Sequence, residues 1–192
     1  MVEIQEKFKD LPYRVGVGII VLNKENKIFV AKRIDNPKGF WQMPQGGVDE
    51  GEDFLSAAYR ELEEETSIKN VELITEIDEI TTYELPNHLL GKIWKGKFKG
   101  QKQKWYLMRY LGSDNEININ TSKPEFFEWK WIELNSITEI VVNFKLNVYK
   151  ILQKKLEKIE KTQEMLQKIQ NLDREHQKKM GERPSGHIHE MM

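Results

Sequence analysis

Residues 46–68 read GGVDEGEDFLSAAYRELEEETSI, and the larger part of this stretch has the pattern of one amphipathic helix. Leu55, Ala58 and Leu62 recur at helical spacing and predict the buried face of a helix over residues 53–66. The acidic residues at 49, 50 and 52 suit the start of this helix, where the helix dipole favours negative charge. The stretch therefore predicts a central helix that carries a concentration of carboxylates.

Three of these carboxylates, Glu61, Glu64 and Glu65, fall within an arc of roughly 100° that borders the apolar stripe. A run of glutamates is usually a solvated face. At the edge of a core, however, crowded carboxylates repel and raise one another's pKa unless a divalent cation neutralises them. Oxygen ligands in this number favour Mg²⁺ or Mn²⁺ over zinc, which prefers histidine and cysteine.

The remaining apolar runs are rich in β-branched and aromatic residues and predict strands over residues 14–22, 28–33, 71–77, 104–110 and 126–132. Strands mixed with a central helix predict an α/β or α+β domain with a mixed sheet. Residues 84–104 hold six lysines against one acid and predict a long basic loop. Four of the five tryptophans are expected in the core: Trp41, Trp105, Trp129 and Trp131.

The C-terminal region, from about Leu146 to Met180, has helix composition. Heptad-like spacing of leucines is interrupted by Gln163 and Gln170, so a coiled coil is only weakly indicated. A chain of 192 residues suits one domain with an appendage. We expect a domain over residues 1–155 and a charged helical tail over 156–192 whose last dozen residues are disordered.

Composition excludes several classes of protein. A formal net charge of −1 offers no global attraction to nucleic acid or membrane. The absence of cysteine excludes disulfides and thiolate metal sites, and the N-terminus lacks the apolar core of a secretory signal. The run from Val15 to Leu22 is too short to span a bilayer. A cytoplasmic protein without a membrane role is expected.

The acidic stretch also matches a known pattern. Its spacing resembles the Nudix box, with the matching residues Gly46, Glu52, Arg60, Glu61, Leu62, Glu64, Glu65 and Ile68. Six of these eight positions admit a single residue type in the box, and all six would match by accident on the order of once in ten million starting points. Ser67 stands where the box usually has glycine at the helix end, and it should cost about 1 kcal/mol or move that end slightly.

Further motifs are similar to one branch of the Nudix family, the RNA pyrophosphohydrolases, also described as dinucleoside polyphosphate hydrolases. They are WQMPQGG (41–47), GQKQKW (100–105), TSKPEFFEW (121–129) and VVNFK (141–145). The resemblance covers roughly residues 12–152. It implies the Nudix α/β/α sandwich around a mixed sheet, with a C-terminal helical extension outside it.

The resemblance also implies roles for individual residues. Glu61, Glu64 and Glu65 would hold catalytic Mg²⁺, or Mn²⁺ as a substitute, with the carbonyl of Gly46 as a further ligand. Glu125 would be a metal ligand or the general base that activates water. Glu52 and Arg60 would form a structural pair that orients the helix.

An anionic substrate needs donors around its phosphates. The candidates are Arg14, Arg33, Lys102, Lys104 and Lys145. Phe144, with Tyr83 as a helper, would stack the base at the 5′ end.

The function implied is metal-dependent removal of pyrophosphate from the 5′-triphosphate end of RNA, leaving a 5′-monophosphate, as in RNA decay. Hydrolysis of dinucleoside polyphosphates such as diadenosine tetraphosphate remains open, because both substrates present a base, a ribose and a phosphate chain. A catalytically weak module that binds RNA ends is an alternative of another class. A protein partner for the tail is conceivable, but nothing in the sequence supports one.

Overall fold

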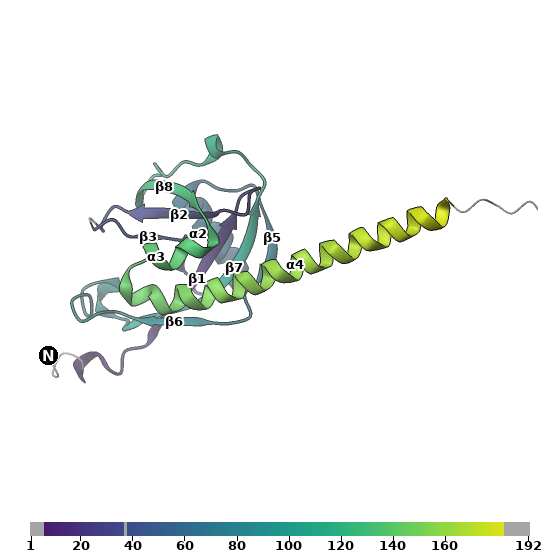
Figure 1. Ribbon diagram of the computed structural model, residues 1–192. Helices are drawn as coiled ribbons and strands as arrows, with labels where there is room; N and C mark the ends of the chain where they lie inside the picture. Colours follow the sequence, from purple (N-terminus) through teal and green to yellow (C-terminus); the bar gives the residue numbers. More distant parts are fainter. Residues whose placement is uncertain (1–5, 37, 183–192) are drawn as a thin grey trace, which may run out of the picture. The chain divides into compact units, whose positions relative to one another are not determined.

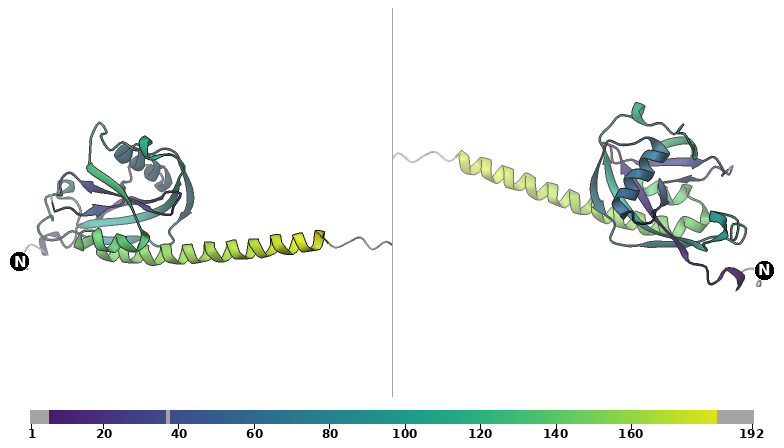
Figure 2. Two further views of the ribbon diagram at one scale, coloured as in Figure 1. Left: turned by 45° about the horizontal axis from the view of Figure 1, so that its top comes forward. Right: turned by 180° about the vertical axis from the view of Figure 1, so that it is seen from behind.

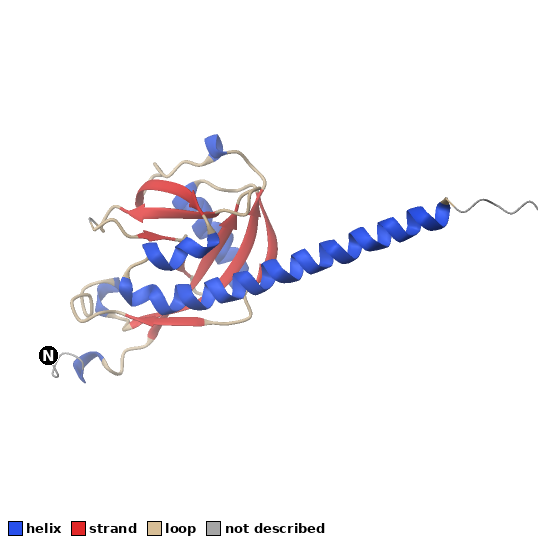
Figure 3. Cartoon of the chain, in the orientation of Figure 1, coloured by secondary structure: helices blue, strands red, loops and turns tan. Residues whose placement is uncertain are grey.

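The computed structural model describes residues 6–36 and 38–182. The strands are β1 (Tyr13–Leu22), β2 (Ile28–Arg33), β3 (Trp41–Gln42), β4 (Gln45–Gly47), β5 (Val71–Glu76), β6 (Thr81–Glu84), β7 (Gly100–Tyr110) and β8 (Phe126–Ile132). The helices are α2 (Phe54–Thr66), α3 (Ile137–Ile140) and α4 (Leu146–Gly181), with a 3₁₀ turn, η1, at Trp94–Gly96 (Figure 1; Figure 3). Within the described ranges, no helix combines the length and apolar character needed to cross a membrane.

All the strands belong to one mixed sheet, as predicted. Its main path is β3-β2-β1-β7-β5, while β4 pairs with β1, β6 with β7 and β8 with β2. The two longest strands, β1 and β7, run parallel from the Tyr13↔Gly100 pair to the Leu22↔Arg109 pair. The other pairings are antiparallel.

Each face of the sheet is covered by helix, which gives the predicted α/β/α layering (Figure 2). On one face Val17 and Met108 pack in a core with Ala58 and Leu62 of α2. On the other face the ring of Trp105 meets that of Tyr149, near the start of α4, edge to face at 6.2 Å. Gly18 is needed beneath this ring, because a Cβ there would overlap Trp105.

Local hydrogen bonds define both ends of α2. Asp53 is the N-cap, and its Oδ1 accepts a bond of 2.9 Å from the Ser56 amide. At the other end Ser67 adopts the left-handed conformation (φ 63°) that the box usually assigns to glycine. The acidic residues at 49, 50 and 52 lie before the cap, and the first turn of the helix itself contains no acidic residue.

The predicted basic loop over residues 84–104 is wrong at its C-terminal end, because β7 begins at Gly100. The sequence did not reveal this part of the strand, because lysines occupy alternate positions where apolar residues would be expected. Gln101 and Gln103 between them are the buried residues. The core prediction for tryptophan is confirmed for Trp41 and Trp105, which are 8% and 0% exposed. The other two, at 129 and 131, are only partly buried and pack against the edge of the core.

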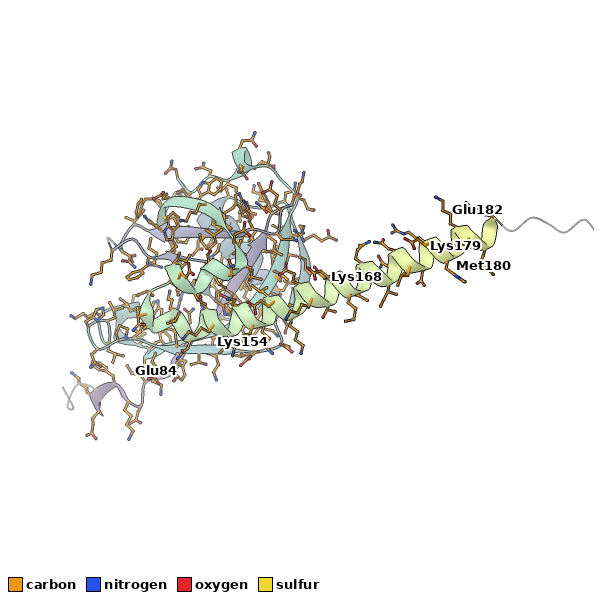
Figure 4. All side chains as sticks on the ribbon, viewed as in Figure 1. Glu84, Lys154, Lys168, Lys179, Met180 and Glu182 are labelled. Atoms are coloured by element: carbon orange, nitrogen blue, oxygen red, sulfur yellow. The ribbon has the colours of Figure 1, made fainter. Side chains whose placement is uncertain are left out.

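The chain divides into two compact units, one ending at Lys154 and the other beginning at Lys155. Helix α4 continues through this boundary and has 36 residues, which confirms the predicted C-terminal helix. In the second unit residues 160–182 are exposed, as the side chains of Lys168 and Met180 illustrate in Figure 4. The predicted disordered end begins at Gly181, which the structure instead includes in α4, and residues 183–192 lie outside the described residues.

Candidate active site

Helix α2 and strand β4 together place the acidic residues. Glu61 is half-buried, Glu64 is exposed and Glu65 is 3% exposed, so the three carboxylates lie at the boundary between core and solvent. The backbone amide of Gln45 in β4 donates to Glu65 Oε2 at 3.3 Å. The Glu61 carboxyl lies against Gly46, where a Cβ would overlap it. Glycine is therefore the residue that lets strand and carboxylate approach.

The structure brings the side chain of Glu125 close to that of Glu65. Glu125 precedes β8, and its carbonyl oxygen accepts a 2.9 Å bond from the Ile34 amide just after β2. Burial, together with the neighbouring Glu125 and Glu61 carboxylates, raises the pKa of Glu65 well above its ordinary value. A buried carboxylate facing a second one is costly unless a proton or a cation compensates it.

Arg60 donates hydrogen bonds to Glu52, Glu61 and Glu64. Its Nε and Nη2 bind the two Glu52 oxygens at 2.7 and 2.8 Å, and Nη2 also donates to the Gly47 carbonyl at 2.9 Å. Its Nη1 reaches Glu61 at 2.9 Å and Glu64 at 3.1 Å. Hydrogen bonding to Arg60 lowers the pKa of Glu52 to about 2. Burial raises the pKa of Glu61, while its bond to Arg60 acts in the opposite direction.

These contacts divide the four predicted carboxylate ligands into two pairs. Glu61 and Glu64 are drawn to Arg60, whereas Glu65 lies against Glu125. Accordingly, the described part of the chain contains no ready-made group of three acidic or histidine side chains around one point. The donors nevertheless fit a hard divalent cation, because all are oxygens and the buried Glu65 has another carboxylate as its neighbour.

Tyr83, Phe144 and Lys145, three of the predicted substrate-binding residues, lie together in a second cluster, and their role stays a prediction. The rings of Tyr83 and Phe144 are 5.7 Å apart, and Lys145 Nζ lies 5.3 Å from the Tyr83 ring centre. Lys145 Nζ donates to Gln42 Oε1 at 3.2 Å. Burial, with a further contribution from the charge of Arg33, lowers the pKa of Lys145 to about 7. Because Tyr83 and Lys145 are buried, the half-buried Phe144 offers the accessible ring of the cluster.

Both predicted arginines lie near these two clusters. Arg33 makes a two-bond contact with Asp35 at 2.7 and 2.8 Å, a partner that the sequence did not single out. Burial raises the pKa of Tyr83 to about 12, while the nearby charges of Arg14 and Arg33 act in the opposite direction. The Arg14 guanidinium lies against Gly47, the neighbour of the predicted metal ligand Gly46.

Lys102 and Lys104 are placed differently. Side chains alternate along β7, so these lysines point to the opposite face from the buried Gln101 and Gln103. Lys104 Nζ pairs with Glu76 at 2.6 Å and lies 5.5 Å from the Phe54 ring. The structure does not bring these two lysines to the Tyr83 cluster, and phosphate binding by them stays a prediction.

Four buried glutamines were missed by the sequence reasoning: Gln42, Gln45, Gln101 and Gln103. Gln103 Nε2 donates to Gln45 Oε1 at 3.0 Å, and the Tyr83 hydroxyl donates to Gln101 Oε1 at 2.8 Å. Among the described atoms, the Nε2 groups of Gln42 and Gln101 and the Oε1 of Gln103 are buried without a hydrogen-bond partner. Glutamine at alternate positions of a strand, in GQKQKW, was the available signal.

Comparison with known proteins agrees with this geometry. The NUDIX domain family model matches residues 12–152. The RNA pyrophosphohydrolase of Pelagibacter ubique is 69% identical over 150 residues, which cover 78% of this chain and 95% of that protein. The RNA pyrophosphohydrolase of Rickettsia canadensis is 46% identical over 154 residues, covering 80% and 96%.

Solved structures show the same fold. A Caenorhabditis elegans Ap4A hydrolase complex aligns with a TM-score of 0.56 at 23% identity, covering 76% of this chain and 96% of that one. The dihydroneopterin triphosphate pyrophosphohydrolase of Escherichia coli aligns with a TM-score of 0.55 at 20% identity, covering 72% and 95%. The family model, the sequence relatives and the acidic helix beside Gly46 agree, and the chain belongs to the Nudix family.

Proposed function

We propose that this protein removes pyrophosphate from the 5′-triphosphate end of RNA and leaves a 5′-monophosphate. The observation that carries the proposal is the buried Glu65 carboxylate facing Glu125 beside the Gln45 backbone, since this costly arrangement serves cation-dependent chemistry. The substrate is suggested by the RNA pyrophosphohydrolase of Pelagibacter ubique, which is 69% identical. A cytoplasmic role in RNA decay follows from this assignment.

Nudix hydrolases generally use divalent metal ions. We propose Mg²⁺, with Mn²⁺ as a substitute, held by four carboxylates and one carbonyl: Glu61, Glu64, Glu65, Glu125 and Gly46. When bound, the metal neutralises phosphate charge and makes the attacking water more acidic. Glu64 is exposed, and among the described residues its side chain bonds to Arg60 alone, so it can turn from the arginine to the cation.

The chain itself supplies a proton acceptor and a rigid frame. Glu125 is exposed, and the hydrogen bond at its carbonyl anchors its backbone beside β2. These contacts support the proposal that Glu125 accepts the proton of the attacking water or joins the ligands. Arg60 and Glu52 tie α2 to the carbonyl of Gly47. They hold the carboxylates in place and are structural.

The substrate would lie between the acidic cluster and the Tyr83 cluster. Phe144 would stack the first base, with Tyr83 and the cation of Lys145 behind it. Arg14 and Arg33 would bind phosphates. The unpartnered Nε2 groups of Gln42 and Gln101 would donate to polar groups of the substrate, since buried polar atoms generally find a partner.

Dinucleoside polyphosphates are the second candidate substrate. The Ap4A hydrolase alignment, at 23% identity, supports the fold and not the substrate, so RNA is the better supported choice. A module that only binds RNA ends is less well supported, because every predicted acidic ligand is present. We place the catalytic domain at residues 1–155 and regard residues 156–192 as an appended tail with no supported protein partner.

The test compares pyrophosphate release from triphosphorylated RNA with hydrolysis of diadenosine tetraphosphate at equal Mg²⁺. Glu64→Gln should remove most turnover without loss of stability. Glu63→Gln is the matched control, because Glu63 is exposed on the same helix and pairs with Lys69 at 3.4 Å. Full turnover by Glu64→Gln would contradict the metal site. Preference for the dinucleotide would transfer the proposal to that substrate.

A further inference from the structure

The segment from Gly91 to Lys99, which we call the lysine loop, is a positively charged surface outside the two clusters described above. Residues 85–113 contain no aspartate or glutamate. Within the loop Lys92, Lys95 and Lys97 are exposed. Among the residues that the structure describes, none of these three lysines belongs to an ion pair, unlike Lys27 or Lys104. Their charge is therefore available to an external anion.

The lysine loop has a defined conformation. Its first turn closes with a 2.9 Å bond from the Gly96 amide to the Ile93 carbonyl, and the rings of Trp94 and Phe98 meet edge to face at 6.3 Å. Trp94 and Lys95 have positive φ values of 49° and 57°. Non-glycine residues in this region cost on the order of 1–2 kcal/mol each, and such strain persists where the surroundings enforce it. The lysines are thus presented on a constrained turn.

Trp94 connects this turn to the candidate active site. Its ring lies 5.3 Å from the Arg14 guanidinium carbon, within cation–π distance. The same guanidinium lies against Gly47, adjacent to Gly46. One arginine side chain therefore separates the lysine loop from the backbone that borders the acidic cluster.

We propose that the lysine loop binds the phosphates of the RNA chain downstream of the 5′ end. This inference rests on the proposed function, because RNA held by its 5′ end carries further phosphates out of the site. Single strands bind where positive charge and aromatic rings occur together, as Lys95 and Lys97 do with Trp94 and Phe98. A dinucleoside polyphosphate has no phosphodiester chain to extend over the loop. The surface therefore distinguishes long RNA from a small substrate sharing the same cleavage chemistry.

The test replaces Lys92, Lys95 and Lys97 with glutamine in the full chain. The matched control replaces Lys24, Lys69 and Lys150, which are exposed and lie on other parts of the domain. Both variants lose the same charge. For each, kcat/KM is measured on triphosphorylated RNA of about 20 nucleotides and on diadenosine tetraphosphate over a range of salt.

In the lysine loop variant, the ratio of kcat/KM on long RNA to that on the dinucleotide should fall about tenfold at low salt. The logarithmic salt slope on RNA should become shallower by about 2, because each single-strand phosphate contact contributes about 0.7. The control variant should keep the wild-type ratio. Equal losses in the two variants, an unchanged salt slope, or an equal loss on both substrates would each overturn the proposal.

Binding of 5′-monophosphorylated RNA, followed by fluorescence anisotropy, separates this inference from the proposed function. A wild-type protein that binds this RNA but releases no pyrophosphate would contradict the activity alone. The proposal for the lysine loop would then be supported if the lysine loop variant, and not the control, bound this RNA more weakly and with a shallower salt slope. Equal binding by the wild type and the lysine loop variant would overturn it.

Discussion

Replacing Lys145 with methionine should stabilise the protein at neutral and acid pH and destabilise it in alkali. Burial, with the charge of Arg33, lowers the pKa of Lys145 from 10.5 to about 7. Below this value the folded protein must keep a charged ammonium out of water, so the cost is fully present. As pH rises from about 7 to 10.5, the folded lysine is neutral while the unfolded one still binds a proton, and the cost disappears.

The magnitude follows from two opposing effects. A pKa lowered from 10.5 to about 7 corresponds to a cost of up to about 5 kcal/mol at low pH. Methionine removes this cost, but it also removes the 3.2 Å bond to Gln42 Oε1. Leaving that buried amide oxygen unpartnered costs about 1–3 kcal/mol. We therefore expect a gain of about 2–4 kcal/mol near pH 6 and a loss of about 1–3 kcal/mol near pH 10.5.

Urea unfolding of wild type and variant, followed by tryptophan fluorescence at several pH values, measures this difference. Lys150→Met is the matched control, because Lys150 is exposed in α4, the helix that begins directly after Lys145. The control should change stability little and equally at each pH. If Lys145→Met changed the unfolding free energy by the same amount at both ends of the pH range, the reasoning about the buried ammonium would be refuted.

Three further perturbations test other parts of the structure. Glu65→Gln should raise the melting temperature in EDTA at pH 7, because the raised pKa of Glu65 means that its buried carboxylate destabilises the fold. The gain should shrink as the pH falls toward about 4.5, because Glu65 then becomes protonated in the folded protein. The same variant should lose hydrolysis and stabilisation by Mg²⁺, and an unchanged melting temperature in EDTA would contradict the argument. Ser67→Gly should leave stability nearly unchanged in urea unfolding, because relief of about 1 kcal/mol of strain offsets the lost 2.8 Å bond to the Asn118 carbonyl. Ser67→Ala should cost about 1 kcal/mol, and equal stabilities of the two variants would speak against this balance. Truncation after Lys155 should keep kcat/KM on diadenosine tetraphosphate within about twofold and lower it on long RNA at low salt. Equal losses on both substrates would mean that the tail supports the fold.

Periodicity was sufficient where a segment has one buried face. The stripe of Leu55, Ala58 and Leu62 identified α2 to within one residue, since Asp53 proved to be its cap. The alternation failed in residues 100–104, because β7 there buries glutamine and exposes lysine. Strands β3, β4 and β6 have two, three and four residues, which is too short to show a period.

Motif spacing likewise identified the acids of the site but not their partners. Glu61, Glu64 and Glu65 share one helix, so their proximity follows from helical geometry. The contact of Glu125 with Glu65 depends on how β2 and β8 pair, with a register shift between Lys32 and Arg33. The contact of Arg33 with Asp35 is local, and it depends on the conformation of the chain just after β2. The unpartnered glutamine atoms could not be predicted either, because they lie on β3 and β7, where burial is decided by the tertiary structure.

The sequence by itself determined the family, the central helix, the mixed sheet and the long C-terminal helix, because these depend on local periodicity and on motif spacing. Tertiary structure alone decided which cations face the site. Lys102 and Lys104 point away from the Tyr83 cluster, since a strand sends neighbouring side chains to opposite faces. Lys145 is buried with a pKa lowered to about 7, whereas Lys92, Lys95 and Lys97 remain exposed. These lysines cannot be told apart by residue type. The atoms that surround each one in the folded protein determine whether its ammonium group stays in water.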